Sequence, residues 1–490
     1  MIKQKSIKKN YIYNLLNLVS TSIIPLVTYP YITRVLGPSG LGKVNFAISI
    51  SSYFILVASL GIPTYGIRAI AVARDDNKRL NRTVHELFFI NAIMSILCTA
   101  ALLIITFLFP QLREIALLMF INAINVIMTP FSLNWFYQGI EEYQYITIRN
   151  VAFKILSVFL IFIFIKNSND YYIYAIIAVI QTSGAYIINF LHLRKYVSFK
   201  LQRNYQIRNH LKPSFTFFAM SAATNIYIAL PNTILGFLKG DEAVGFFSVS
   251  QKINTVLLQC CVALGTVLLP RLSYYIEKRE MKQFNAIVKK SINFTLALAC
   301  PIVGYLMLNA KYLILVFAGD KYDASILPLQ ILSFILIFAG LSNVTGIQVL
   351  IPMKKEHITT ASVILGAVVG IILFFFLIPP YSVVGTAISC AIVEVFVLAF
   401  QLIFIKRKMK ISIITKDFYK YFVAAFAASV INYSVSLFLN VGFLLQLILS
   451  FIVYSIFYVV SLCLLKDSTV KYGIDTILRF MRGVANHGNR

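Results

Sequence analysis

The chain has 490 residues, of which 59% are hydrophobic and only 13% are charged, and its 44 Lys and Arg outnumber its 18 Asp and Glu to give a formal net charge of +26. An average soluble protein is about 45–50% apolar and about 25% charged, so this composition argues against a soluble protein and against a disordered basic tail. It also argues against a nucleic-acid binder, which needs a polar, charge-dense face, and it leaves a polytopic membrane protein.

The apolar stretches predict an all-α integral membrane protein with about 14 transmembrane helices. A helix needs about 20 predominantly apolar residues to cross the hydrocarbon layer. Fourteen stretches meet this length, and they lie near residues 11–33, 44–66, 87–109, 114–137, 146–165, 171–192, 214–237, 244–269, 285–308, 325–351, 358–378, 382–404, 418–438 and 442–465.

The basic residues predict the orientation of these helices. When the loops are assigned to alternate sides, 35 Lys and Arg fall on the side of the N-terminus and 7 fall on the other side. Cytoplasmic loops carry the excess of Lys and Arg, so both termini are expected in the cytoplasm of a multi-pass protein of the bacterial cell membrane.

The loops leave no room for an enzyme. The outer loops are no longer than about 15 residues, and the inner loops contain no Walker-type glycine loop. The six cysteines lie in apolar stretches, and no Cys or His spacing indicates a metal site. We therefore expect a protein that is not an enzyme and has no catalytic residue, no metal and no cofactor.

A weak internal repeat divides the chain. A late proline and then a glycine pair spaced Gly-x4-Gly recur in the two halves, with the glycines 203 residues apart, at Pro30, Gly37 and Gly42 and again at Pro231, Gly240 and Gly245. The repeat predicts a six-helix lobe in residues 1–200, a second in 201–410, and two additional helices with a cytoplasmic tail in 411–490. The prolines fit either bending points for alternating access or fixed helix curvature.

Few ionisable side chains remain at or within the membrane, where each costs at least about 2.5 kcal/mol. They are mostly cationic, which would suit a water-filled cavity for an anion such as a phosphate or an acidic sugar. The cations could instead extend to lipid headgroups, and the single carboxylate could serve ion coupling or pair with a lysine. These residues are Arg34, Lys43, Arg68, Lys154 and Lys252 among the cations, and Glu394.

Six segments, in order along essentially the whole chain, resemble polysaccharide flippases of the multidrug/oligosaccharidyl-lipid/polysaccharide exporter superfamily. They are Pro30-Tyr-Ile-Thr-Arg34-Val-Leu-Gly37 with Gly42; Gly61 to Arg68 with Arg74-Asp75; Asn134 to Glu141, which contains Gln138 and Gly139; Arg149-Asn150 with Lys154; Gly245 to Lys252; and Glu394.

The resemblance implies a two-lobed transporter that moves polyprenyl-diphosphate-linked oligosaccharide from the cytoplasmic to the outer leaflet for surface polysaccharide synthesis. Lys252, Arg34, Lys154 and Arg68 are the expected anion contacts, and Glu394 is the expected ion-coupling or ion-pair residue. The expected partners are this lipid-linked substrate, membrane lipids, and a polysaccharide polymerase and glycosyltransferases, but no nucleic acid.

Two other functions stay open from the sequence. One is a lipid II flippase of the same superfamily, and the other is a non-transporting scaffold of a glycan assembly complex. The drug antiporter branch fits less well, because cationic drugs need carboxylates and the first span has none.

Overall fold

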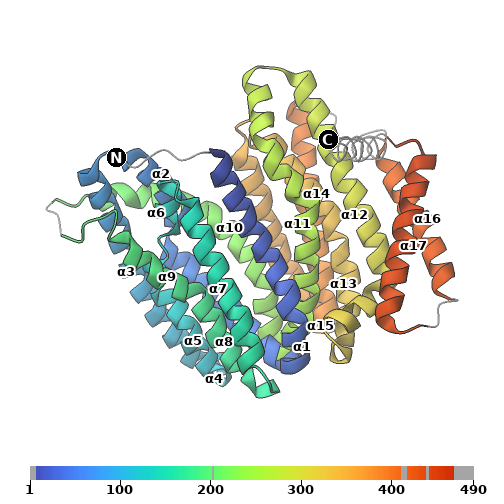
Figure 1. Cartoon of the computed structure of the whole chain (residues 1–490), viewed down its shortest axis with the longest axis horizontal. Helices are drawn as coiled ribbons and strands as arrows, with labels where there is room; N and C mark the ends of the chain where they lie inside the picture. The colour runs from blue at the N-terminus through green and yellow to red at the C-terminus, as the bar shows by residue number, and fades with distance from the viewer. Residues whose placement is uncertain (1–6, 201–203, 410–416, 438–440, 468–490) are drawn as a thin grey trace, which may run out of the picture. The chain divides into compact units, whose positions relative to one another are not determined.

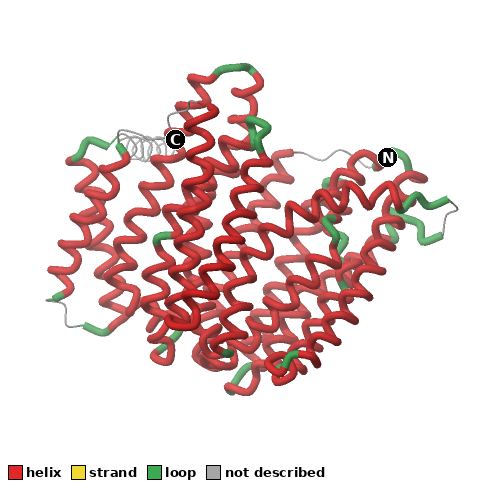
Figure 2. The backbone as a smooth tube through the Cα atoms, turned by 180° about the vertical axis from the view of Figure 1, so that it is seen from behind, coloured by secondary structure: helices red, strands yellow, loops and turns green. Residues whose placement is uncertain are grey.

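The computed structural model of the chain describes residues 7–200, 204–409, 417–437 and 441–467, and these residues form helices and loops without a strand (Figure 2). The chain divides into two compact units, Met1–Ser248 and Val249–Arg490. The predicted boundaries at residues 200 and 410 stay predictions. The predicted cytoplasmic tail after residue 467 lies outside the described residues.

The first unit holds the N-terminal helices. Its long helices run through the unit and are joined by short helices at their ends (Figure 1). They are α1 (Ile7–Ser59), α2 (Ile62–Ala73), α3 (Asn77–Leu108), α4 (Pro110–Glu114), α5 (Ala116–Ile127), η1 (Thr129–Phe131), α6 (Asn134–Gly139), α7 (Tyr143–Phe164), η2 (Ser168–Asp170), α8 (Tyr171–Val179), η3 (Ile180–Gly184), α9 (Ala185–Leu193), α10 (Arg208–Lys239) and the start of α11 (Asp241–Glu277).

The second unit continues from α11. Its last two helices, α16 and α17, pack on each other and on α12. Its elements are α12 (Met281–Phe317), η4 (Asp320–Ser325), α13 (Ile326–Ser333), α14 (Ile335–Asn343), η5 (Val344–Leu350), α15 (Glu356–Phe404), η6 (Ile405–Met409), α16 (Phe418–Ser436) and α17 (Phe443–Leu464).

The helices are built to cross a membrane. Among the described residues, eight are long and apolar enough to do so, or ten if each of two bent pairs is one span. Two of the eight, Ile23–Ala73 with 51 residues and Glu356–Met409 with 54, contain about 77 Å and about 81 Å of helix at 1.5 Å per residue, which is enough for two crossings each. Their backbones are non-helical at Gly37 and at Ser382. The predicted all-α membrane fold is confirmed, and the count of fourteen stays a prediction.

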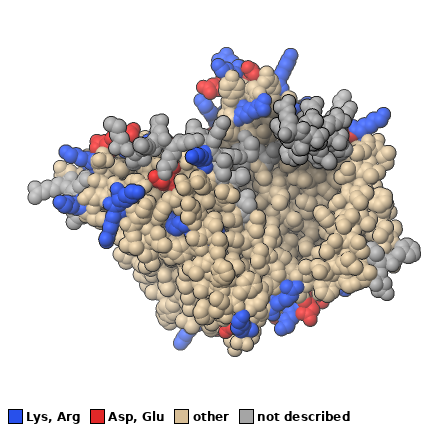
Figure 3. All heavy atoms as spheres, in the orientation of Figure 1, with Lys and Arg blue, Asp and Glu red and all other residues tan. Residues whose placement is uncertain are grey.

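The surface agrees with this assignment. On the face shown in Figure 3, Lys and Arg gather mainly at the ends of the helices, and the sides between are covered almost entirely by uncharged residues. Large apolar side chains such as Phe107, Phe159 and Phe376 are more than half exposed on these sides. Such surfaces are stable in lipid, because they expose no polar group that lacks a partner there.

The two glycine pairs form matching hairpins, both in the first unit. Gly37 (φ 69°, ψ 177°) and Gly240 (φ 81°, ψ −175°) share a backbone conformation that is essentially restricted to glycine. A Cβ on Gly42 would overlap the carbonyl oxygen of Asp241, and a Cβ on Gly245 would overlap that of Pro38. Gly42 of the first hairpin thus lies against Asp241, the residue after Gly240. Gly245 of the second hairpin lies against Pro38, the residue after Gly37.

A hydrophobic cluster fixes α2, α3 and α6 together at the other end of the unit. It contains the aromatic run Trp135, Phe136 and Tyr137 of α6, all buried. Gly139 packs so closely on α2 that a Cβ there would lie 2.7 Å from Cβ of Ile70. This rigid packing holds the beginning of α3 beside α2.

Candidate functional site

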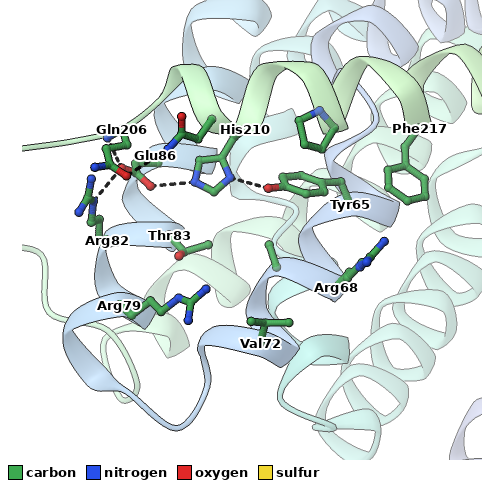
Figure 4. A pocket seen from close by; sticks show the side chains of 13 residues that line it. Tyr65, Arg68, Val72, Arg79, Arg82, Thr83, Glu86, Gln206, His210 and Phe217 are labelled. Carbon is green, nitrogen blue, oxygen red and sulfur yellow. Dashed lines mark hydrogen bonds and ion pairs between the residues drawn. The ribbon is translucent and has the colours of Figure 1, made fainter.

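A pocket of about 520 Å³ opens in the first unit, where α2 and α3 meet the start of α10 and the segment before it (Figure 4). It lies at the helix ends that the charge distribution predicts to face the cytoplasm. Its lining combines charged, polar and apolar side chains from these elements: Tyr65, Arg68, Ala69 and Val72 of α2, Arg79, Arg82, Thr83 and Glu86 of α3, and Gln206, Asn209, His210, Pro213 and Phe217.

The start of α3 is set by its sequence. The side chain of Asp76 accepts hydrogen bonds from the backbone amides of Lys78 (2.9 Å) and Arg79 (3.2 Å) and so caps the helix. Arg79, Arg82 and Glu86 then follow at three- and four-residue spacing and share one face of the helix. The cap therefore fixes where these side chains enter the pocket.

One wall of the pocket is a row of hydrogen bonds centred on Glu86, whose side chain is 4% exposed. Its carboxylate accepts from Arg82 Nε (3.0 Å), from His210 Nε2 (2.8 Å) and from the backbone amide of Gln206. The other ring nitrogen of His210, Nδ1, lies 2.7 Å from the hydroxyl of Tyr65. The row joins α2, α3 and α10 and neutralises Glu86.

The rest of the pocket keeps positive charge. Arg68 and Arg79 are exposed, and no carboxylate of the described chain lies within ion-pair distance of either. In Figure 4 they lie below the Glu86 row, on α2 and α3 respectively. A pocket with three guanidinium groups and one paired carboxylate favours an anion, and guanidinium binds phosphate oxygens with paired hydrogen bonds.

A second polar cluster joins α7 to α1. Lys154 is half-buried, and its Nζ donates to Thr21 Oγ1 (2.6 Å), Ser20 Oγ (3.0 Å) and the carbonyl of Asn17 (3.4 Å). All three acceptors are neutral oxygens, so these hydrogen bonds fasten α7 to α1 without an ion pair.

Arg149 lies one and a half helical turns before Lys154 on α7 and is 5% exposed. Its guanidinium donates to Oδ1 of Asn134 (2.8 Å), Asn150 (2.6 Å) and Asn189. Buried arginines need such partners, because an unpaired buried charge is costly. Arg149 therefore joins α6, α7 and α9 within the unit.

The other predicted residues lie elsewhere. Arg34 is exposed on α1, and its guanidinium donates to the carbonyl of Pro30 (3.1 Å). Lys252 on α11 and Glu394 on α15 are half-buried and belong to the second unit. Of the four predicted anion contacts, only Arg68 lines the described pocket, and their joint cavity stays a prediction.

Two residues of the quoted motifs do meet. Arg74 Nη1 lies 2.7 Å from Glu141 Oε1 although they are 67 positions apart, and this hydrogen bond raises the pKa of Arg74. The carbonyl of half-buried Gln138 accepts the backbone amide of Glu141 at 3.0 Å. The aromatic-Gln-Gly segment thus presents Glu141 to the loop after α2.

Sequence reasoning missed Arg79, Arg82, Glu86, His210 and Tyr65 as neighbours. One signal was present, since Glu86 is the only acidic residue of α3 and shares a helix face with two arginines. No sequence pattern links Glu86 to His210, which lies 124 positions away. Within the described ranges, no three His, Cys, Asp or Glu side chains are grouped to hold a metal ion.

Comparison with known proteins gives a consistent assignment. The family model described as "Polysaccharide biosynthesis protein" matches residues 7–276. The "Putative O-antigen transporter" of Escherichia coli (strain K12) is 24% identical over 407 residues, which cover 82% of this chain and 97% of the relative. The "Capsular polysaccharide biosynthesis protein CapF" of Staphylococcus aureus is 25% identical over 415 residues, which cover 82% and 99%.

Solved structures show the same fold. The inward closed lipid II flippase MurJ superimposes with a TM-score of 0.70 at 17% identity and covers 93% of this chain and 100% of its own. An inward-facing multidrug resistance transporter of the MATE family and MOP superfamily gives a TM-score of 0.60 at 14% identity and covers 84% and 98%. The chain therefore belongs to the polysaccharide biosynthesis protein family and has the fold of the multidrug/oligosaccharidyl-lipid/polysaccharide exporter superfamily.

Proposed function

We propose that this protein is a flippase that carries polyprenyl-diphosphate-linked oligosaccharide repeat units from the cytoplasmic to the outer leaflet of the bacterial cell membrane. The observation that carries the proposal is the family match, together with relatives named as an O-antigen transporter and a capsular polysaccharide biosynthesis protein over nearly their whole length. These relatives are named for transport and biosynthesis of surface polysaccharide, which is why we favour this substrate class.

The chemistry of the chain supports the proposal. A diphosphate cannot cross hydrocarbon unaided, because moving its charge out of water is costly. A cavity with fixed cations would replace its hydration, and Lys252, Arg34, Lys154 and Arg68 are the side chains that we assign to it. The polyprenyl tail would stay in lipid.

The mechanism that we assign is alternating access. Pro30 in α1 and Pro231 in α10 lie inside helices and close to the paired glycine hairpins, where bending would be concentrated. Glu394 is assigned to ion coupling or to an ion pair. Both termini are placed in the cytoplasm, and a polymerase and glycosyltransferases of the same polysaccharide are the proposed partners.

The test is reconstituted transport. Proteoliposomes would carry a fluorescent lipid-diphosphate-linked sugar, and dithionite quenching would report how much of it reaches the opposite leaflet. We expect Lys252→Ala to abolish flipping while the protein still folds and inserts. Lys239→Ala, which removes an exposed lysine at the end of α10, should flip as the wild type does. Normal flipping by Lys252→Ala would remove Lys252 from the anion contacts.

The lipid II alternative is separated by the choice of substrate. The same vesicles would be loaded with fluorescent lipid II in place of the repeat-unit analogue. If lipid II were flipped faster than the repeat-unit analogue, lipid II would be the assigned substrate. Flipping of neither substrate would favour the scaffold.

A further inference from the structure

The pocket formed by α2, α3 and the start of α10 contains Arg68, one of the four residues assigned to the transport cavity, but Lys252, Arg34 and Lys154 do not line it. Its volume of about 520 Å³ lies within the about 300–1,000 Å³ typical of small-molecule sites. Two of its arginines, Arg68 and Arg79, have no carboxylate partner in the described ranges. Both guanidinium groups are exposed and line the same pocket.

The Glu86 row makes the pocket selective for an anion. If Glu86 were unpaired, its charge would repel a phosphate at the same site. Arg82, His210 and the Gln206 amide all donate to the carboxylate, and the guanidinium of Arg82 offsets its charge. The hydroxyl of Thr83 lies between the row and Arg79 and offers a neutral donor (Figure 4).

The surroundings fit a lipid phosphate better than a soluble one. Val72 lines the pocket and is 61% exposed. On α10, half-buried Phe217 also lines the pocket. A cationic pocket bordered by apolar side chains matches an amphiphile whose phosphate groups adjoin a hydrocarbon chain.

We propose that this pocket is a docking site that receives the diphosphate of the lipid-linked substrate at the cytoplasmic end of the first unit, before the substrate reaches the transport cavity. This proposal rests on the proposed function for the identity of the substrate. Arg68 and Arg79 bind the phosphate oxygens, and Val72 and Phe217 contact the first isoprene units. The same chemistry could come from an ordinary phospholipid headgroup or from a free phosphate, and the test separates these sources.

The binding test uses the full chain in phosphatidylcholine nanodiscs, with inorganic pyrophosphate as the probe in isothermal titration calorimetry. Arg68→Gln/Arg79→Gln should weaken binding at least about tenfold, because two charge-assisted hydrogen-bonding groups are lost. The matched control Lys78→Gln/Lys200→Gln removes two exposed charges that do not line the pocket and should stay within about twofold. Unchanged binding in the arginine variant, or an equal loss in the control, would overturn the site.

Each variant is first checked for a wild-type unfolding temperature. Both arginines are exposed and form no ion pair with a described residue, so we expect both substitutions to fold. If the double variant unfolds, Arg79→Gln alone should weaken pyrophosphate binding about threefold. Wild-type affinity in that single variant would count against the proposal in the same way.

Competition identifies the ligand. Undecaprenyl diphosphate added to the nanodiscs should displace pyrophosphate in the wild type, whereas one-third phosphatidylglycerol should not. Equal displacement by phosphatidylglycerol would make this a phospholipid site, and displacement by neither would make it a free-anion site; either result overturns the docking role. Equilibrium binding requires no transport, so the two proposals can fail separately. If the wild type binds pyrophosphate but does not flip the substrate, only the proposed function is contradicted. If it flips the substrate but its binding does not depend on the two arginines, only the docking site is contradicted.

Discussion

Glu86 is the residue on which the pocket wall depends most. Its nearly buried carboxylate accepts from donors on α3, on α10 and on the segment that leads into α10. An interaction of this kind contributes little net stability when complete, because both partners must be desolvated. Its removal is costly, since the donors then remain in the protein without an acceptor.

Glu86→Ala should therefore lower the free energy of unfolding by about 3 kcal/mol, the cost of breaking a buried ion pair from one side. Glu86→Gln should cost less, because its amide oxygen still accepts one or two of these hydrogen bonds. Denaturant titration of the purified protein in detergent measures both. Asp75→Ala, an exposed acidic residue of the neighbouring loop, is the control and should change stability by no more than about 0.5 kcal/mol. Equal stability of the Glu86 and Asp75 variants would contradict the role given to the row.

Among the elements, the paired hairpins of the first unit depend on small residues at matched positions. Gly42 and Gly245 let two backbones approach so closely that neither position has room for a methyl group. Membrane helices often meet through small residues, because lipid supplies no hydrophobic force to bring them together. The contact thus depends on the fit of the backbones.

Gly42→Ala should destabilise the protein by about 3 kcal/mol, since the added Cβ meets a carbonyl group that cannot rotate away. The midpoint of thermal unfolding, followed by size-exclusion chromatography of the detergent-solubilised protein, would show the shift. Gly442→Ala is a matched control, because no atom lies within 4 Å of its added Cβ and its φ of −57° suits alanine. If Gly42→Ala unfolded at the same temperature as the control, the close contact between the hairpins would not contribute to stability.

Across the whole molecule, apolar stretches of membrane-spanning length were sufficient to predict the all-α fold, and the Gly-x4-Gly pairs marked the positions of the two hairpins. Arg68 was predicted as an anion contact because few cations lie at or within the membrane. The pocket around Arg68 was not predictable, because Glu86 and His210 lie 124 positions apart in the chain. The packing of α10 on α2 brings them together. The break at Gly37 falls between the predicted spans 11–33 and 44–66.

The orientation of the chain in the membrane is a property of its whole charge distribution. With 35 basic residues assigned to one side and 7 to the other, the positive-inside rule predicts that the pocket end of the first unit faces the cytoplasm. In a variant without its six native cysteines, Lys195→Cys should react with a membrane-impermeant maleimide only in inverted vesicles, whereas Asn169→Cys should react in whole cells. Both side chains are exposed, so accessibility is decided by the side of the membrane and not by burial. The reverse labelling pattern would turn the pocket toward the outside, where a docking site for a substrate made in the cytoplasm would have no use.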